Sequence, residues 1–136
     1  MINLLIGKKG TGKTKKLVEL ANNAVAKTNG GVVVIEKGTA LTYDLDHNAR
    51  LVDVDAYGVN SYDVLYGFIS GICAGNYDLT DIFVDSTFKI CETKIDGLAE
   101  FVNKLNTLKI DANIVLLISA DKSELPSELQ AFCGEI

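Results

Sequence analysis

Four short segments of the chain are almost purely apolar and rich in β-branched residues. They cover residues 2–6, 32–35, 82–84 and 114–118. Short apolar runs without polar alternation are typical of strands that are buried on both faces of a sheet. A fifth segment, residues 51–54, alternates apolar and polar side chains, which predicts a strand nearer the edge of the same sheet.

Stretches with helical periodicity lie between these runs, at residues 14–27, 61–74 and 95–109. Asn60 or Ser61 can cap the second, and Pro126 suits the first turn of a short last helix that ends near Cys133–Gly134. The order β-α-β-β-α-β-α-β-α predicts an α/β fold: a three-layer α-β-α sandwich around a five-stranded, mainly parallel sheet. We expect residues 1–136 to form a single domain.

Composition narrows the class of protein. Of 136 residues, 48% are hydrophobic and 23% charged, as in ordinary globular domains. The net charge of −5 disfavours direct binding to nucleic acid. No apolar run approaches the ~20 residues that a membrane span needs, and the N-terminal residues lack the pattern of a signal peptide. Three cysteines without CxxC spacing predict reduced thiols and a cytoplasmic location.

The clearest chemical motif is GKKGTGKT, which fits the phosphate-binding pattern G-x-x-x-x-G-K-[ST] and stands between a predicted strand and a predicted helix. Glycines allow successive backbone N–H groups to point into one concavity, and the helix N-terminus adds positive potential. A lysine here reaches the β- and γ-phosphates, and the hydroxyl that follows it binds Mg²⁺. The alternative is a glycine-rich turn with solvated lysines. The predicted phosphate-binding residues are Gly7, Lys8, Lys9, Gly10, Thr11, Gly12, Lys13 and Thr14.

Three polar residues stand where apolar runs end, and the carboxyl ends of parallel strands are where ligands bind in open α/β sheets. Asp85 would hold Mg²⁺ together with Thr14, Glu36 would orient an attacking water, and Ser119 would contact the γ-phosphate. The structural alternatives are a cap or loop acid for Asp85, a solvated acid or a partner of Lys37 for Glu36, and a turn residue for Ser119.

With these motifs the chain resembles the P-loop NTPases, and among them the RecA-like ATPases. The segments GKKGTGKT, VVVIEKG, DIFVDS and NIVLLIS carry the resemblance, which covers about residues 1–122. It is also similar to small bacterial P-loop proteins loosely labelled twitching-motility ATPases. The resemblance implies ATP and Mg²⁺ as ligands and a sheet in which residues 2–6 lie beside residues 114–118, with residues 82–84 beyond.

The same resemblance implies roles for single residues. Glu36 would be the catalytic base, because RecA-like proteins carry that glutamate at the end of the strand after the phosphate-loop helix. Tyr43 falls where a RecA-type aromatic ring stacks on adenine, although a core or surface tyrosine is an equal alternative. The places of the recombinases' glycine-rich DNA loops hold short, non-basic segments, so DNA strand exchange is not expected.

We therefore expect a nucleoside triphosphate-binding protein with slow Mg²⁺-dependent ATPase activity that needs a protein partner or self-assembly. One alternative is a nucleotide-sensing interaction module that does not hydrolyse its ligand. Another is a small-molecule kinase, which the presence of a single arginine, Arg50, disfavours, since such kinases clamp phosphates with several arginines.

Two further features have structural interpretations. His47 lies in a polar loop and is expected to be solvated. Gly67, Gly71 and Gly75 share one helix face, which is expected to pack closely on the sheet, with a helix–helix contact between copies as the alternative.

Overall fold

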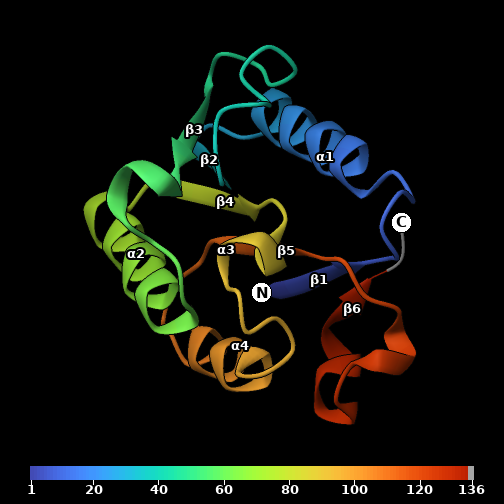
Figure 1. Ribbon diagram of the computed structural model, residues 1–136. Coiled ribbons are helices and arrows are strands. Elements are labelled where there is room, and N and C mark those ends of the chain that lie inside the picture. Colours follow the sequence, from blue (N-terminus) through green and yellow to red (C-terminus); the bar gives the residue numbers. More distant parts are fainter. Residues whose placement is uncertain (135–136) are drawn as a thin grey trace.

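The computed structural model describes residues 1–134 and has the predicted α/β class, with one sheet flanked by helices (Figure 1). Residues 135 and 136, which the predicted domain includes, lie outside the described residues. The elements are β1 (Ile2–Ile6), α1 (Lys13–Lys27), β2 (Gly31–Glu36), β3 (Ala49–Asp53), η1 (Val54–Tyr57), α2 (Tyr62–Gly75), β4 (Leu79–Val84), α3 (Thr87–Ile90), α4 (Leu98–Asn106), β5 (Asn113–Ile118), η2 (Lys122–Glu124), η3 (Ser127–Phe132) and β6 (Cys133–Gly134), where η marks 3-10 helices.

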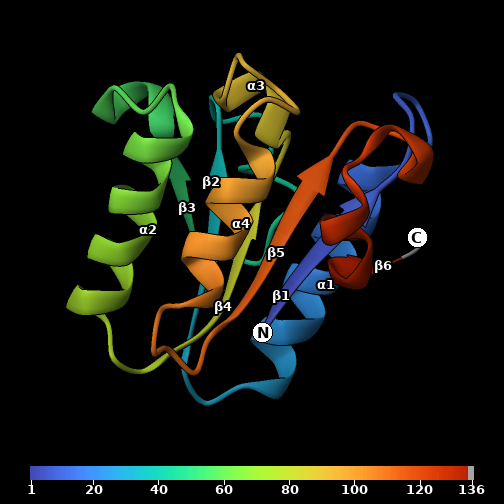
Figure 2. The same cartoon turned by 90° about the horizontal axis from the view of Figure 1, so that it is seen from below.

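The six strands lie in the order β3-β2-β4-β5-β1-β6, and every neighbouring pair is parallel. The expected arrangement of three strands is confirmed, because β1 pairs with β5 and β4 lies beyond β5. The segment predicted to be nearer the edge forms β3, which is an edge strand. Since all strands run in one direction, their carboxyl ends meet at one end of the sheet (Figure 2).

Side chains alternate between two apolar layers along the central strands. On one face Leu5, Val34 and Phe83 pack with Leu17 and Ala21 of α1. The opposite face carries a larger core, which includes buried residues of α2, α3, α4 and η3. Both faces are therefore covered, which explains why these strands have nearly continuous apolar sequences.

The prediction of five strands was wrong by one. Residues 133–134, expected at the end of the last helix, form the short strand β6, which pairs with Leu4 and Leu5 of β1. The preceding helix is a 3-10 helix that follows Pro126. The free edge of β1 gives the end of the described chain a backbone partner, and this long-range pairing outweighs a local helical tendency.

The glycine face of α2 does not pack on the sheet. A Cβ built on Gly67, Gly71 or Gly75 meets no atom within 4 Å, so the expected close packing is wrong. The helix instead buries Leu65 and Ile69, because burying large apolar side chains stabilises the fold more than burying a glycine surface. Ser61 caps this helix as predicted, since its Oγ accepts a hydrogen bond from the N–H of Val64.

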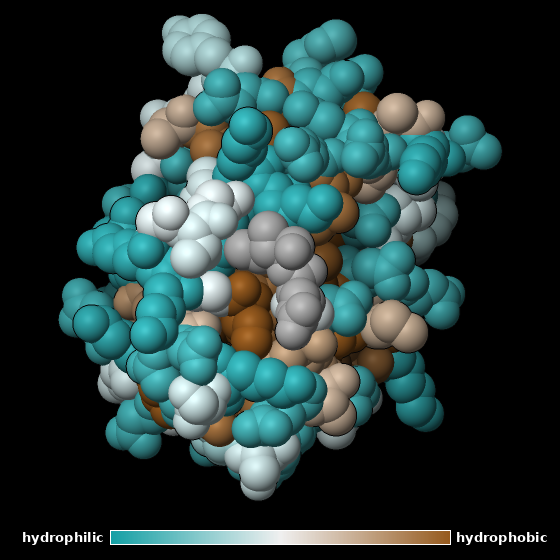
Figure 3. Space-filling view, turned by 90° about the vertical axis from the view of Figure 1, so that its right-hand side faces the viewer, coloured by the Kyte–Doolittle hydropathy of each residue, from teal (hydrophilic) through white to brown (hydrophobic). Residues whose placement is uncertain are grey.

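One face of the molecule is seen in a space-filling view. On the face formed by the right-hand side of Figure 1, polar residues predominate and a smaller apolar area shows near the centre (Figure 3). No helix within residues 1–134 combines the length and the apolar character that crossing a bilayer requires.

Candidate functional site

The segment from Gly7 to Gly12 connects β1 to α1 at the carboxyl end of the sheet. Gly10 and Gly12 both have φ of 85°, a left-handed conformation that favours glycine. No side chain caps the first turn of α1, and that turn contains no acidic residue. The loop therefore presents uncapped N–H groups at the positive end of a helix, an arrangement that suits a bound phosphate.

Lys13 lies beneath this loop rather than in solvent. Lys13 is only 6% exposed, so it is not one of the solvated lysines of the glycine-rich-turn alternative. Lys13 is the first residue of α1, and its Nζ donates to the carbonyl oxygen of Lys8 at 2.7 Å. Burial lowers the pKa of Lys13, while the charge of Asp85 opposes this shift. The ammonium group is thus held at the loop by a carbonyl that a phosphate oxygen can replace.

The structure brings Thr14 and Asp85 into contact. Thr14 Oγ1 donates to Asp85 Oδ1 at 3.2 Å, and the hydroxyl of Ser86 donates to the other carboxylate oxygen at 3.2 Å. Asp85 directly follows β4 and is 6% exposed, and its N–H donates to the carbonyl of Ile35 in the neighbouring strand. A buried carboxylate beside a hydroxyl fits Mg²⁺, which is usually bound by one or two protein oxygens together with waters and phosphate oxygens. Within residues 1–134 there is no cluster of three or more His, Cys, Asp or Glu side chains suited to a metal.

Glu36 is buried at the end of β2, where it is 5% exposed. Its carboxylate accepts hydrogen bonds from the N–H groups of Ala40 at 3.1 Å and Leu41 at 3.2 Å. Both structural alternatives for Glu36 are wrong, since it is not solvated and Lys37 pairs with Asp55 instead. Burial raises the pKa of Glu36, as does the nearby charge of Asp85, whereas the two N–H donors lower it.

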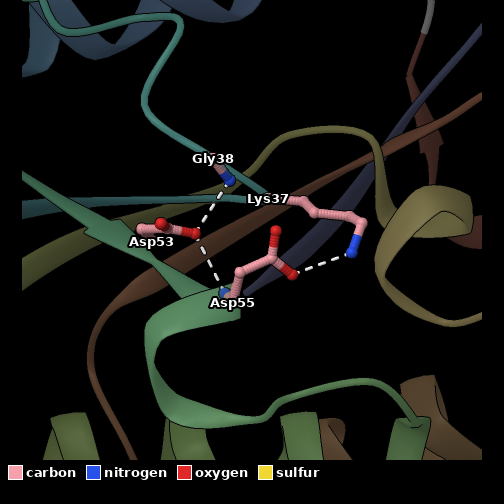
Figure 4. A network of polar contacts seen from close by, with 4 residues as sticks. All are labelled: Lys37, Gly38, Asp53 and Asp55. Carbon is pink, nitrogen blue, oxygen red and sulfur yellow. Dashed lines mark hydrogen bonds and ion pairs between the residues drawn. The ribbon is translucent and has the colours of Figure 1, made fainter.

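Asp53 is a functional candidate that the sequence interpretation missed. It lies opposite Glu36 in the register of β2 and β3. Its Oδ1 accepts from the N–H of Gly38 at 2.8 Å and of Asp55 at 2.9 Å, and Lys37 Nζ pairs with Asp55 at 2.8 Å (Figure 4). These bonds fix the turn that follows Glu36, where Gly38 has φ of 103°. The signal in the sequence is that Asp53 is an acid near the end of the fifth predicted strand. The expected bounds of that strand, residues 51–54, put Asp53 inside it, whereas β3 ends at Asp53.

Two other predicted contact residues, Ser119 and Tyr43, are exposed. Ser119 follows β5 at the same end of the sheet and is exposed. Tyr43 is 97% exposed in the loop after β2, so of its two structural alternatives the surface position is the one observed. Arg50 lies opposite Val33 within β3, three residues before Asp53, or about 10 Å along the strand from that end. Arg50 therefore lies away from the loop of residues 7–12.

We expect Glu36 to make the metal-free protein less stable as the pH rises through the weakly acidic range. Its pKa is raised above 4.5, so the folded state keeps a proton where the unfolded state has lost it. The stability due to this proton is present below pH 4.5 and is lost as the pH rises through the raised pKa. Urea unfolding in EDTA between about pH 4 and pH 7 should show the parent losing stability relative to Glu36→Gln. A gain by the parent across this range would contradict the assigned environment.

No protein-family model matches the chain, and comparison with the curated proteins finds no match.

Proposed function

We propose that this protein binds ATP with Mg²⁺ in the cytoplasm and hydrolyses it slowly, as a P-loop NTPase of the RecA-like type that a protein partner or self-assembly activates. The observation that carries the proposal is the hydrogen bond between Thr14 of the phosphate-loop helix and Asp85 at the end of β4. Residues far apart in the sequence thereby meet as the hydroxyl and carboxylate that a nucleotide-bound Mg²⁺ requires.

The sheet order supports the RecA-like type over the kinase-like type. In a kinase-like arrangement the strand that ends in Asp85 would lie directly beside β1. Here β5 separates the two strands. This order also supports Glu36 as the base, because the resemblance that assigns it implies the same order.

Each residue has a distinct role in the proposed reaction. The loop N–H groups and Lys13 bind the phosphates, with Lys13 exchanging the carbonyl of Lys8 for a phosphate oxygen. Bound Mg²⁺ would neutralise charge on the β- and γ-phosphates, held by Thr14 and Asp85. Glu36 would orient the attacking water. Ser119 would contact the γ-phosphate and Tyr43 would stack on the base.

Slow turnover follows from two features of the site. Glu36 is 5% exposed and its carboxylate already accepts from the N–H groups of Ala40 and Leu41, which restricts its access to a water. The single arginine, Arg50, lies away from the loop of residues 7–12, so no arginine of this chain reaches the γ-phosphate. An arginine supplied by another molecule is worth ~10³–10⁵ in rate in other NTPases. The engaged Glu36 also favours the second candidate, a module that binds nucleotide without turning it over.

We expect Asp85→Asn to abolish the gain in ATP affinity that Mg²⁺ gives the parent. Asparagine keeps the shape of the side chain but removes the charge that holds the metal, and losing a charged partner costs about 1.5–3 kcal/mol. Calorimetry with ATP, ADP and GTP, with and without Mg²⁺, measures this gain. Asp81→Asn is the matched control, because Asp81 lies toward the other end of the same strand. An undiminished Mg²⁺ effect in Asp85→Asn would contradict the metal assignment.

A further inference from the structure

A hollow opens at the carboxyl end of the sheet, beside the proposed phosphate loop. It has a volume of about 340 Å³ and is formed by Lys9 of the loop, the segment after β4 and the segment after β5. Lys13, Thr14 and Asp85 are not among its lining residues. Lys9 and Ser119, which belong to the proposed nucleotide site, do line it. The hollow therefore adjoins that site and shares these two residues with it, and we call it the lysine cavity.

Positive charge is concentrated in the lysine cavity although the protein as a whole is acidic. Lys9, Lys89 and Lys94 all line it, and in the part of the chain that the structure covers none of them forms an ion pair. The one acid in the lining is Glu124, whose carboxylate accepts a hydrogen bond from the N–H of Asp121 in a capping box. Three unpaired cations against one engaged carboxylate leave a net attraction for an anion.

The backbone of this cavity is held in an unusual conformation. Among the described residues, the non-glycine residues with positive φ are Ser86 at 49° and Lys94 at 57°, and both line the cavity. The carbonyl of Lys94 accepts a hydrogen bond from the hydroxyl of Tyr62, which is 8% exposed and anchors the turn to α2. Residues held in this conformation cost free energy and cluster at ligand sites, so the two outliers support a binding role.

The remaining walls define the rest of the ligand. Phe88 and Ile95 are half-buried and provide apolar surface, while Ser86 and Ser119 provide hydroxyl groups. The volume is at the small end of the range for small-molecule pockets. Lysine is a strongly hydrated point charge that binds phosphates and carboxylates. The cavity thus suits an anionic group on a compact apolar body.

We propose that the lysine cavity binds a small organic anion, carrying a phosphate or a carboxylate, next to the proposed nucleotide site. Nucleic acid is the less favoured ligand, because the chain carries 18 acidic against 13 basic residues and the cavity would enclose only part of a polymer. The inference can be tested apart from nucleotide binding, since Lys89 and Lys94 have no role in the proposed nucleotide site and the lining excludes Lys13 and Thr14.

The test is an NMR titration of the isotope-labelled chain with phenyl phosphate and, separately, with benzoate. We expect one or both probes to shift the backbone amides of residues 86–95 and 119, both in the parent with Mg·ADP and in Lys13→Met. The probe that binds more tightly identifies the preferred anion. Lys89→Gln combined with Lys94→Gln should weaken the binding at least tenfold, because each substitution removes a charged contact. The control combines Lys27→Gln with Lys109→Gln, which removes the same charge at the opposite end of the sheet and should leave the affinity unchanged.

Several results would overturn the inference. The first is equal affinity in the Lys89→Gln/Lys94→Gln protein and the parent when thermal melting shows that both are folded. Amide shifts that are confined to residues 7–14 and vanish in Lys13→Met would place the probe in the phosphate loop instead. Tighter binding of a short oligothymidylate through the same two lysines would show a nucleic-acid surface. If the parent binds the probe in this cavity but does not bind Mg·ATP, the proposed function is wrong and the inference about the lysine cavity is supported.

Discussion

Replacing Lys13 with methionine is expected to weaken Mg·ATP binding by roughly 30- to 160-fold, or about 2–3 kcal/mol. The ammonium group is already desolvated, as its lowered pKa indicates, and it donates to one carbonyl of its own loop. A triphosphate replaces that neutral partner with a charged one, which adds the Coulombic attraction of a desolvated ion pair to the hydrogen bond. Methionine is preferred to alanine because it retains the buried stem of this 6% exposed side chain.

Calorimetry measures the affinity and thermal melting checks the fold. The matched control is Lys15→Met, two residues further along α1, where the lysine is exposed. Its affinity for Mg·ATP should stay within a few-fold of the parent. Equal ATP affinity in Lys13→Met and the parent would remove the phosphate-loop assignment, whatever the behaviour of Lys15→Met.

Glu36→Gln is expected to reduce the slow turnover of Mg·ATP by roughly 10²–10⁴-fold, the usual contribution of a general base. Glutamine has nearly the same shape and keeps one carbonyl oxygen, which can accept from one of the two N–H groups, those of Ala40 and Leu41, that bond to different oxygens of the carboxylate. The affinity for Mg·ATP should therefore change little while phosphate release nearly stops. Single-turnover phosphate release with protein in excess over ATP measures the step directly.

The concentration dependence of phosphate release tests whether turnover needs an arginine from another molecule. If copies of this chain activate one another, the specific rate should rise with protein concentration and Arg50→Ala should abolish the rise. If only a different protein activates it, the rate should stay low and Arg50→Ala should have no effect. Fast turnover that is independent of concentration and unaffected by Glu36→Gln would show that the assigned base and the need for a second cation are both wrong.

The sequence predicted most of the sheet because its central strands are buried on both faces. In β2 and β4 this burial requires nearly continuous apolar residues, which contrast sharply with the amphipathic pattern of α1. The sixth strand, β6, carries no such signal. Its two residues form a strand because they pair with β1, which is far away in the sequence. The face of α2 was misassigned because glycines spaced four apart reveal a stripe but not whether it faces the protein or the solvent.

The sequence predicted which residues form most of the candidate site, but it did not predict their contacts. Strand ends identified Glu36 and Asp85, and the register of parallel strands places them at the same end of the sheet. The burial of Lys13 depends on how the side chain folds back beneath the loop, which periodicity does not encode. The role of Asp53 depends on the exact end of β3, and a difference of one residue in that boundary was enough to hide it.

The position of β1 in the sheet has a consequence for biosynthesis. Of the six described strands β1 is made before the others, yet its neighbours are β5 and β6, so Ile2 finds its partner only when Ile114 has been made. Pairings between such distant segments form slowly, because the chain loses conformational entropy in closing a long loop before the paired strands gain any stabilising contacts. The segment from Gly7 to Gly12 thus follows a strand that has no paired neighbour, while β2, β3 and β4 can already associate. A nascent chain that stalls before Asn113 contains the phosphate loop, Glu36 and Asp85, but lacks the strand that joins β1 to β4.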